Sequence, residues 1–170
     1  MTIRRSTAAD EPALRVLDRA TWTSESSPAP TPPAARRFFG TECAPRDVLV
    51  ALDGEEIVGY VRIAPPTPLQ SNRHVLEIRG LSVDPGRRRQ GIGRALLDAA
   101  AQEAAGRGVR RLTLHVLGHN EGAQAVYARC GFGVEGVLRE EFELDGRYVD
   151  DVLMARVIGP ADAARPRPVS

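Results

Sequence analysis

The sequence predicts a single α/β domain with a mixed sheet of about seven strands and about four helices on its two faces. Its 170 residues suit one hydrophobic core. Strand-like and helix-like segments follow the order β-α-α-β-β-β-α-β-α-β-β, which is typical of a mixed sheet. Two Asp-Gly pairs, Asp53-Gly54 and Asp145-Gly146, each lie between strand-like segments and therefore predict hairpins.

Hydrophobic period and turn residues place the individual elements. Segments that are apolar or rich in β-forming residues predict strands at 2–5, 48–52, 57–63, 75–83, 109–117, 134–144 and 148–157. Helical segments follow Asp10 and recur at 34–39, 93–106 and 120–130. The four prolines of residues 24–33 separate the first two helices, and Gly131 is suited to end the last one. We expect one domain over residues 1–159 and a Pro-rich, disordered tail over 160–170.

Composition excludes several classes of protein. The net charge of +1 argues against a protein that coats nucleic acid. The two cysteines, Cys43 and Cys130, form no CxxC pair, so neither a metal site nor a disulfide framework is expected. The sequence has no run of about 18 apolar residues, so no membrane span is expected, and its first residues do not have the pattern of a secretion signal. We therefore expect a cytoplasmic protein without a membrane partner.

The segment VDPGRRRQGIGRALL, residues 83–97, predicts a phosphate site. A strand leads into a loop containing Gly91 and Gly93 and then directly into a helix. Glycine allows close approach of a ligand to the backbone, and the first helical amides lack partners within the helix. Together with the helix dipole these amides favour a pyrophosphate, and Arg88 and Arg89 add positive charge.

Three glycine-rich motifs compete for this loop. A P-loop requires Lys-Ser or Lys-Thr, which is absent, and the dinucleotide fingerprint requires a third glycine, which is also absent. Residues Arg88 to Gly93 instead resemble the R/Q-x-x-G-x-G/A signature of the GNAT (Gcn5-related N-acetyltransferase) superfamily. In that family the loop binds the pyrophosphate of acetyl-coenzyme A through main-chain amides. The alternative is a tight strand–helix turn with solvated arginines.

The resemblance extends over residues 3–157 and is most specific from Glu77 to Phe132. Downstream of the loop, a strand at 112–116 leads to Asn120, and a helix then carries Tyr127 and ends in Gly131-Phe132, as in the family. The resemblance implies a GNAT-type fold with splayed central parallel strands. It also implies direct transfer of acetyl from acetyl-CoA to a primary amine in a ternary complex.

The resemblance further implies which residues bind the cosubstrate. The strand residues Leu81 and Val83 would offer main-chain groups to the pantetheine arm. The pyrophosphate would lie against the loop formed by Arg88, Arg89, Gln90, Gly91, Gly93 and Arg94. Asn120 would contact the pantetheine arm or steady the nearby loop. No metal is expected.

Acetyl transfer needs a base and an acid. An alkylammonium has a pKa near 10, so a base must remove a proton before attack. Glu77 is the candidate base, because residues 77–83 resemble the strand of histone-acetylating members that begins with the catalytic glutamate. The alternatives are a Glu at a solvent-facing strand position, or one paired with Arg79 or Arg73. Tyr127, expected near the cofactor sulfur, is the candidate acid for the leaving thiolate, against a role as a core aromatic. We interpret His115 as a packed or edge histidine.

The acceptor amine stays open. In the family, the segments corresponding to 22–39 and 139–151 build the acceptor site, and the acidic residues of the second could attract a cationic amine or simply be solvated. The ending LREEFELDGRYVDDVLMARV resembles members that acetylate amino acids and other small amines. A small amine or amino acid is therefore preferred over a protein N-terminus or lysine. A non-catalytic acyl-CoA sensor and a homodimer both remain open.

Overall fold

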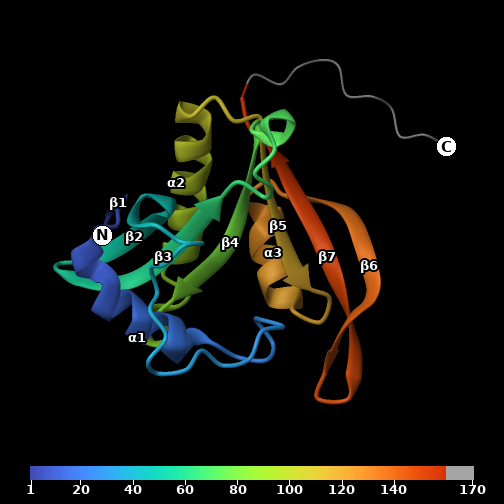
Figure 1. The fold of residues 1–170 in the computed structure, drawn as a ribbon, viewed down its shortest axis with the longest axis horizontal. Coiled ribbons are helices and arrows are strands. Elements are labelled where there is room, and N and C mark those ends of the chain that lie inside the picture. Colours follow the sequence, from blue (N-terminus) through green and yellow to red (C-terminus); the bar gives the residue numbers. More distant parts are fainter. Residues whose placement is uncertain (160–170) are drawn as a thin grey trace.

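The computed structural model describes residues 1–159 and shows a strongly twisted central sheet with helices packed on both faces (Figure 1). The predicted tail at 160–170 lies outside the described residues. The strands are β1 (Thr2–Arg5), β2 (Val48–Asp53), β3 (Glu56–Ala64), β4 (Val75–Val83), β5 (Arg111–Leu117), β6 (Gly133–Leu144) and β7 (Arg147–Val157). The helices are α1 (Glu11–Thr21), α2 (Ile92–Gly106) and α3 (Glu121–Arg129). Short 3-10 turns occupy Ala8–Asp10, Pro45–Asp47, Gln70–Asn72 and Pro85–Arg87.

The seven strands form one mixed sheet in the order β1-β2-β3-β4-β5-β7-β6. Only β4 and β5 run parallel, and all other neighbours are antiparallel. Both predicted hairpins are confirmed, β2–β3 and β6–β7. In the second, Asp145 and Gly146 have φ of 51° and 74°, the left-handed conformations that suit Asp-Gly to a two-residue hairpin turn.

The predicted helix at 34–39 is wrong, so the described chain has three α-helices rather than about four. The segment is held by the first helix instead of by its own carbonyl groups. The N–H groups of Phe38 and Phe39 donate to the two carboxylate oxygens of Glu11, at 2.7 and 2.8 Å. Because these donors are satisfied by a distant side chain, they cannot form helical bonds.

Two hydrophobic clusters stabilise the sheet, one on each face. On one face, α2 buries Leu96 and Leu97 completely against the central strands, and α3 packs on the same cluster. On the other face, Leu14 of α1 is fully buried in a smaller cluster with Val50 and Tyr60. The apolar side of each helix thus faces the sheet.

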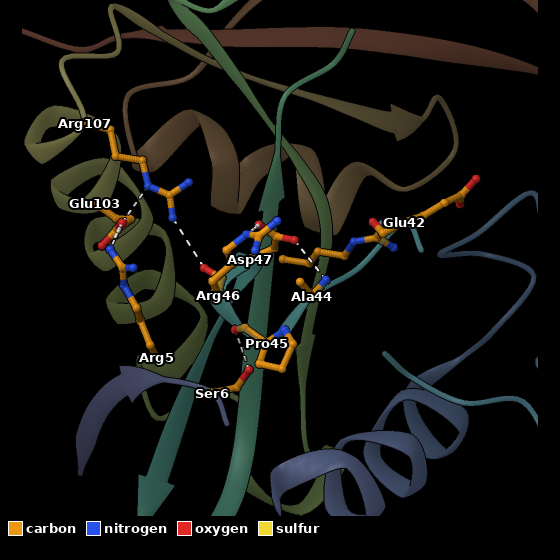
Figure 2. A network of polar contacts seen from close by, with 10 residues as sticks. Arg5, Ser6, Glu42, Ala44, Pro45, Arg46, Asp47, Glu103 and Arg107 are labelled. Carbon is orange, nitrogen blue, oxygen red and sulfur yellow. Dashed lines mark hydrogen bonds and ion pairs between the residues drawn. The ribbon is translucent and has the colours of Figure 1, made fainter. Parts of the chain in front are cut away.

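A polar network joins the first strand to the end of α2 (Figure 2). Glu103 forms ion pairs with Arg5 and with Arg107, the latter at 2.6 Å. Arg107 also donates to the carbonyl of Arg46 at 3.4 Å, and the hydroxyl of Ser6 donates to that of Pro45 at 2.7 Å. These contacts fix α2 against the edge of the sheet.

Among residues 1–159, no helix is long and apolar enough to cross a bilayer.

The two parallel strands separate part of the way along, as the fold class predicted. Pairing runs from Val75–Arg111 to Ile78–Leu114 and then stops. Strand β4 nevertheless continues to Val83 and β5 to Leu117. The carboxyl ends of the central strands therefore form a fork.

Close packing of β3 on α2 requires a residue without a side chain at Gly59. A Cβ there would lie 3.0 Å from the Ser82 carbonyl oxygen and 3.1 Å from Cδ1 of Leu96. We expect Gly59→Ala to lower the free energy of unfolding by about 1–3 kcal/mol through overpacking. Gly133→Ala is the matched control, because a Cβ there meets nothing within 4 Å, and it should change stability by less than about 0.5 kcal/mol. Equal denaturant midpoints for the two variants would contradict this account.

Candidate active site

A β-bulge in β4 opens the fork. Arg62 of β3 pairs with Gly80, but the next residue, Ile63, pairs with Ile78, so that Arg79 is an extra residue in β4. Bulges bend a strand and increase its twist. This one directly follows the last pair between β4 and β5. From Arg79 onward, the edge of β4 that faces β5 has no strand partner within residues 1–159. The Val83 carbonyl accepts from Nε of Arg88 at 3.5 Å, and the other main-chain groups of this edge are available to a ligand.

A cavity of about 910 Å³ begins at this fork. It is bounded by the open half of β4, the start of α2, helices α1 and α3, and the loop between α1 and β2. The residues predicted for the site that line it are Leu81, Val83, Arg88, Arg89, Gly93, Asn120 and Tyr127. Gln90, Gly91 and Arg94 belong to the same loop and helix start but are not among the lining residues.

The glycine-rich loop has the geometry of an anion site. Gly91 precedes α2 with φ of +81°, a left-handed conformation that favours glycine. Its carbonyl accepts the first helical bond, from the N–H of Ala95 at 3.0 Å. The amides of the intervening residues therefore have no acceptor within the helix. With the side chains of Arg88 and Arg89 beside it, this helix end suits a pyrophosphate.

Tyr127 reaches the cavity from α3. Its ring packs edge-on against Phe132 with the ring centroids 6.0 Å apart. Its hydroxyl forms no hydrogen bond with any of residues 1–159, and burial raises the pKa of the phenol to about 12. The phenol therefore stays protonated at neutral pH and can donate a proton to a group in the cavity.

Asn120 connects α3 to the loop that covers the cavity. Its side-chain oxygen caps the helix by accepting from the N–H of Ala123 at 3.0 Å. Its amide nitrogen donates to the carbonyl of Glu25 at 3.1 Å. This second bond fits the expected role of Asn120 in steadying a nearby loop.

Glu77 lies below the fork, where β4 and β5 are still paired. It is opposite Thr113 in the parallel register and is not among the residues that line the cavity. An oxygen of its carboxylate lies 3.3 Å from Nε of Arg79, and its side chain is 20% exposed. The structure thus contains the ion pair that was the alternative interpretation of this residue.

A histidine–aspartate pair borders the fork, and the sequence analysis missed it. His115 immediately follows Leu114, the last β5 residue paired with β4, and it shares a sheet face with Thr113. Its Nδ1 lies 2.6 Å from Oδ2 of Asp151, whose side chain is only 7% exposed. A buried carboxylate that accepts from Nδ1–H leaves Nε2 free to act as a base. The pair depends on the β5–β7 register, which local sequence does not reveal.

Of the two segments expected to build the acceptor site, only the first lines the cavity. Residues of 22–39 form one wall, whereas none of 139–151 is among the lining residues. Within the hairpin, Asp150 pairs with Arg139 at 2.6 Å and also accepts from the N–H of Glu140. The acidic hairpin is therefore not part of this cavity.

Comparison with known proteins shows which family this chain resembles. The Acetyltransferase (GNAT) family profile matches residues 12–132. The mycothiol acetyltransferase of Amycolatopsis mediterranei is 38% identical over 80 residues, which are 45% of this chain and 27% of that protein. The [ribosomal protein bS18]-alanine N-acetyltransferase of Escherichia coli K12 is 37% identical over 75 residues, 44% of this chain and 51% of the relative. The matched segments thus cover about half or less of these relatives.

A solved structure extends the likeness to the whole fold. The smu.2055 protein of Streptococcus mutans UA159 superposes with a TM-score of 0.81 and 28% identity, covering 92% of this chain and 99% of that one. The profile match alone spans well over half of the 170 residues. With its splayed parallel strands and its glycine-rich loop at the start of α2, this chain belongs to the GNAT acetyltransferase family.

Proposed function

We propose that the domain of residues 1–159 transfers an acetyl group from acetyl-CoA to the primary amine of a small molecule or amino acid. The observation that carries the proposal is one continuous cavity that includes the glycine-rich loop, the β4–β5 fork and Tyr127. The loop would hold the pyrophosphate, and the free edge of β4 at Leu81 and Val83 would pair with the pantetheine amides. That arrangement leaves the thioester at the fork, beside Tyr127.

Direct attack of the amine on the thioester would use a main-chain N–H and Tyr127 of the cavity. The neutral amine attacks the thioester carbon, the carbon–sulfur bond breaks, and the products are the N-acetyl amine and the free thiol of coenzyme A. A main-chain N–H near Val83 would polarise the carbonyl oxygen. Tyr127 would give its proton to the departing sulfur. The exclusion of water that raises the pKa of Tyr127 also destabilises a bare thiolate. Proton transfer from the phenol to the thiolate therefore costs less free energy than the raised phenol pKa alone suggests.

Two groups compete for the role of base. Glu77 is the candidate from the sequence, and it would act through water because it lies outside the cavity lining. His115 is the candidate from the structure, because it directly follows the last β5 residue paired with β4 and has a buried aspartate behind it, although it too lies outside the cavity lining. Glu77 and His115 project from the same face of the sheet. A proton leaving an amine at the fork could reach either one.

Two other functions stay as alternatives. Transfer to a protein N-terminus is supported by the likeness to the bS18-alanine enzyme. A non-catalytic acyl-CoA sensor would use the loop without chemistry. Release of free thiol from acetyl-CoA, measured with a panel of small amines and N-terminal peptides, separates all three.

Gly93→Val tests the cosubstrate site. Gly93 lines the cavity in the first turn of α2, and a Cβ there would lie 3.8 Å from Val83. The larger side chain should keep acetyl-CoA from the helix amides and weaken its binding at least tenfold, about 1.4 kcal/mol. Gly106→Ala, at the far end of α2 with nothing within 4 Å of its Cβ, is the control. Calorimetry that gives both folded variants wild-type affinity would exclude the loop as the binding site.

Tyr127→Phe tests the acid. It keeps the ring packing against Phe132 and removes only the hydroxyl. We expect kcat to fall by roughly 10²–10⁴-fold while acetyl-CoA affinity stays nearly unchanged. Unchanged turnover would make Tyr127 a core aromatic.

Glu77→Gln and His115→Gln together assign the base. Each removes a titrating group and retains hydrogen-bonding capacity. Loss of the base should lower kcat/KM by roughly 10²–10⁴-fold and abolish the acidic limb of its pH profile, because a protonated base cannot accept the amine proton. If a variant keeps the limb, the residue that was replaced in it is not the base. Retention of the limb in both variants would assign the proton to another group or to water.

A further inference from the structure

Arginine is frequent in the cavity lining outside the glycine-rich loop, and this part of the lining is called the acceptor half below. Its arginines are Arg15 and Arg19 of α1, Arg36 and Arg37 of the following loop, Arg62 of β3, and Arg79 of β4, which is paired with Glu77. The carboxylate side chains lining the whole cavity are those of Asp18 and Glu25. Arg88 and Arg89 belong to the loop proposed for the pyrophosphate and are not counted here. The acceptor half thus carries positive charge that acetyl-CoA does not require.

Arg62 has an unused donor within this half. Its Nη2 atom donates to the carbonyl of Glu42, which fixes the guanidinium. Its Nε atom is buried and has no hydrogen-bond partner in the described structure. Buried donors without partners are rare in folded proteins, and each one calls for an explanation. Its Nη1 atom also has no partner among residues 1–159 and is not one of the buried atoms, so it is the donor that a ligand oxygen in the cavity can reach.

The space beside Arg62 leads toward the fork. Arg62 is opposite Gly80 in the β3–β4 register, on the same face as Tyr60. A Cβ at Gly80 would lie 3.5 Å from the Tyr60 ring and 4.0 Å from Cβ of Arg62. Gly80 has no side chain, so it leaves the path between the guanidinium and the fork open. Both Arg62 and Gly80 line the cavity.

Within residues 1–159, neither Asp18 nor Glu25 forms an ion pair with these arginines, and of the six only Arg79 is paired, with Glu77. Asp18 accepts a hydrogen bond from the Tyr60 hydroxyl at 2.5 Å. Within residues 1–159, Arg15, Arg37 and Arg62 form no ion pair with any carboxylate. The planar guanidinium fork matches the oxygens of a carboxylate or a similar oxyanion. An anionic ligand is therefore the chemical complement of this half of the cavity.

We propose that the acceptor amine carries an oxyanion group, most simply a carboxylate, and that Arg62 binds this group while the amine faces the fork. The inference rests on the proposed acetyl transfer and narrows its substrate class to anionic amines. It argues against the alternative in which acidic residues of the last hairpin attract a cationic amine, since that hairpin does not line the cavity.

The first test compares amino acids with their primary amides on the wild-type protein. Each pair has the same side chain, and the amide has an uncharged group in place of the carboxylate. We expect kcat/KM to be at least tenfold higher for the acid. The amide contains the less basic amine and therefore more of the neutral nucleophile, so this comparison is biased against the proposal. Equal or better transfer to the amides would overturn it.

The second test compares Arg62→Gln and Arg62→Lys with Arg46→Gln. We expect Arg62→Gln to raise KM for the acid at least tenfold, to leave KM for acetyl-CoA within twofold, and to bring the acid-to-amide ratio close to one. Arg62→Lys should recover only part of the effect, because lysine has the charge but not the guanidinium fork. Arg46 is the control, with its side chain 81% exposed and outside the cavity, and Arg46→Gln should keep the full ratio.

The outcomes separate this inference from the proposed function. Thiol release with neutral and anionic amines alike would retain acetyl transfer and exclude the anionic acceptor. No release with any amine, despite tight acetyl-CoA binding, would exclude both. An unaltered acid-to-amide ratio in a folded Arg62→Gln variant would exclude Arg62 as the binding group. If that variant does not fold, the wild-type comparison alone decides.

Discussion

Beyond Ile78 and Leu114, strands β4 and β5 no longer exchange hydrogen bonds, and the remaining features of the site depend on this separation. Backbone N–H and C=O groups must be paired or solvated, so two strand edges that diverge inside a domain need something between them. The bulge at Arg79 causes the divergence in β4 while β3 remains paired with it on the other side. The result is a rigid strand with one free edge, which can bind an extended polar arm without a change in the fold.

The charge of the domain is organised around this opening rather than spread evenly. The chain has a net charge of only +1, yet arginines from five separate segments line the cavity. Many of the acidic residues lie elsewhere, in surface ion pairs such as Asp53 with Arg87. A concave site lined by one sign of charge concentrates field lines and raises the local concentration of oppositely charged ligands. Both the phosphates of acetyl-CoA and an anionic acceptor fit such a field.

Burial differs among the candidate acid and bases at the fork, and so does its effect on each of them. It holds Tyr127 in its protonated form, as an acid requires. It also makes Asp151 a fixed partner of His115, because a carboxylate with 7% exposure gains more from a nearby donor than an exposed one does. Glu77 instead shares a partly exposed ion pair with Arg79. These surroundings, rather than residue type, distinguish the two candidate bases.

The sequence by itself determined the features that depend on neighbouring residues. The hairpins at Asp53-Gly54 and Asp145-Gly146 and the left-handed Gly91 before α2 follow from local backbone preference. Patterns within short stretches of chain, and the family likeness that they support, predicted the parallel pair β4 and β5 and its splayed ends. They also predicted that Leu81, Val83 and Tyr127 lie at the binding site, and all three line the cavity.

Only the tertiary structure decided the features that depend on distant partners. The helix predicted at 34–39 does not form, because the Glu11 carboxylate takes the amides that it needs. His115 becomes a candidate base only when β7 brings Asp151 beside it, 36 residues away in sequence. Arg62 was an unremarked strand residue until folding placed its incompletely paired guanidinium in the cavity lining. Local propensity records none of these, because side-chain pairing across a sheet depends on strand order and register, which the whole chain determines.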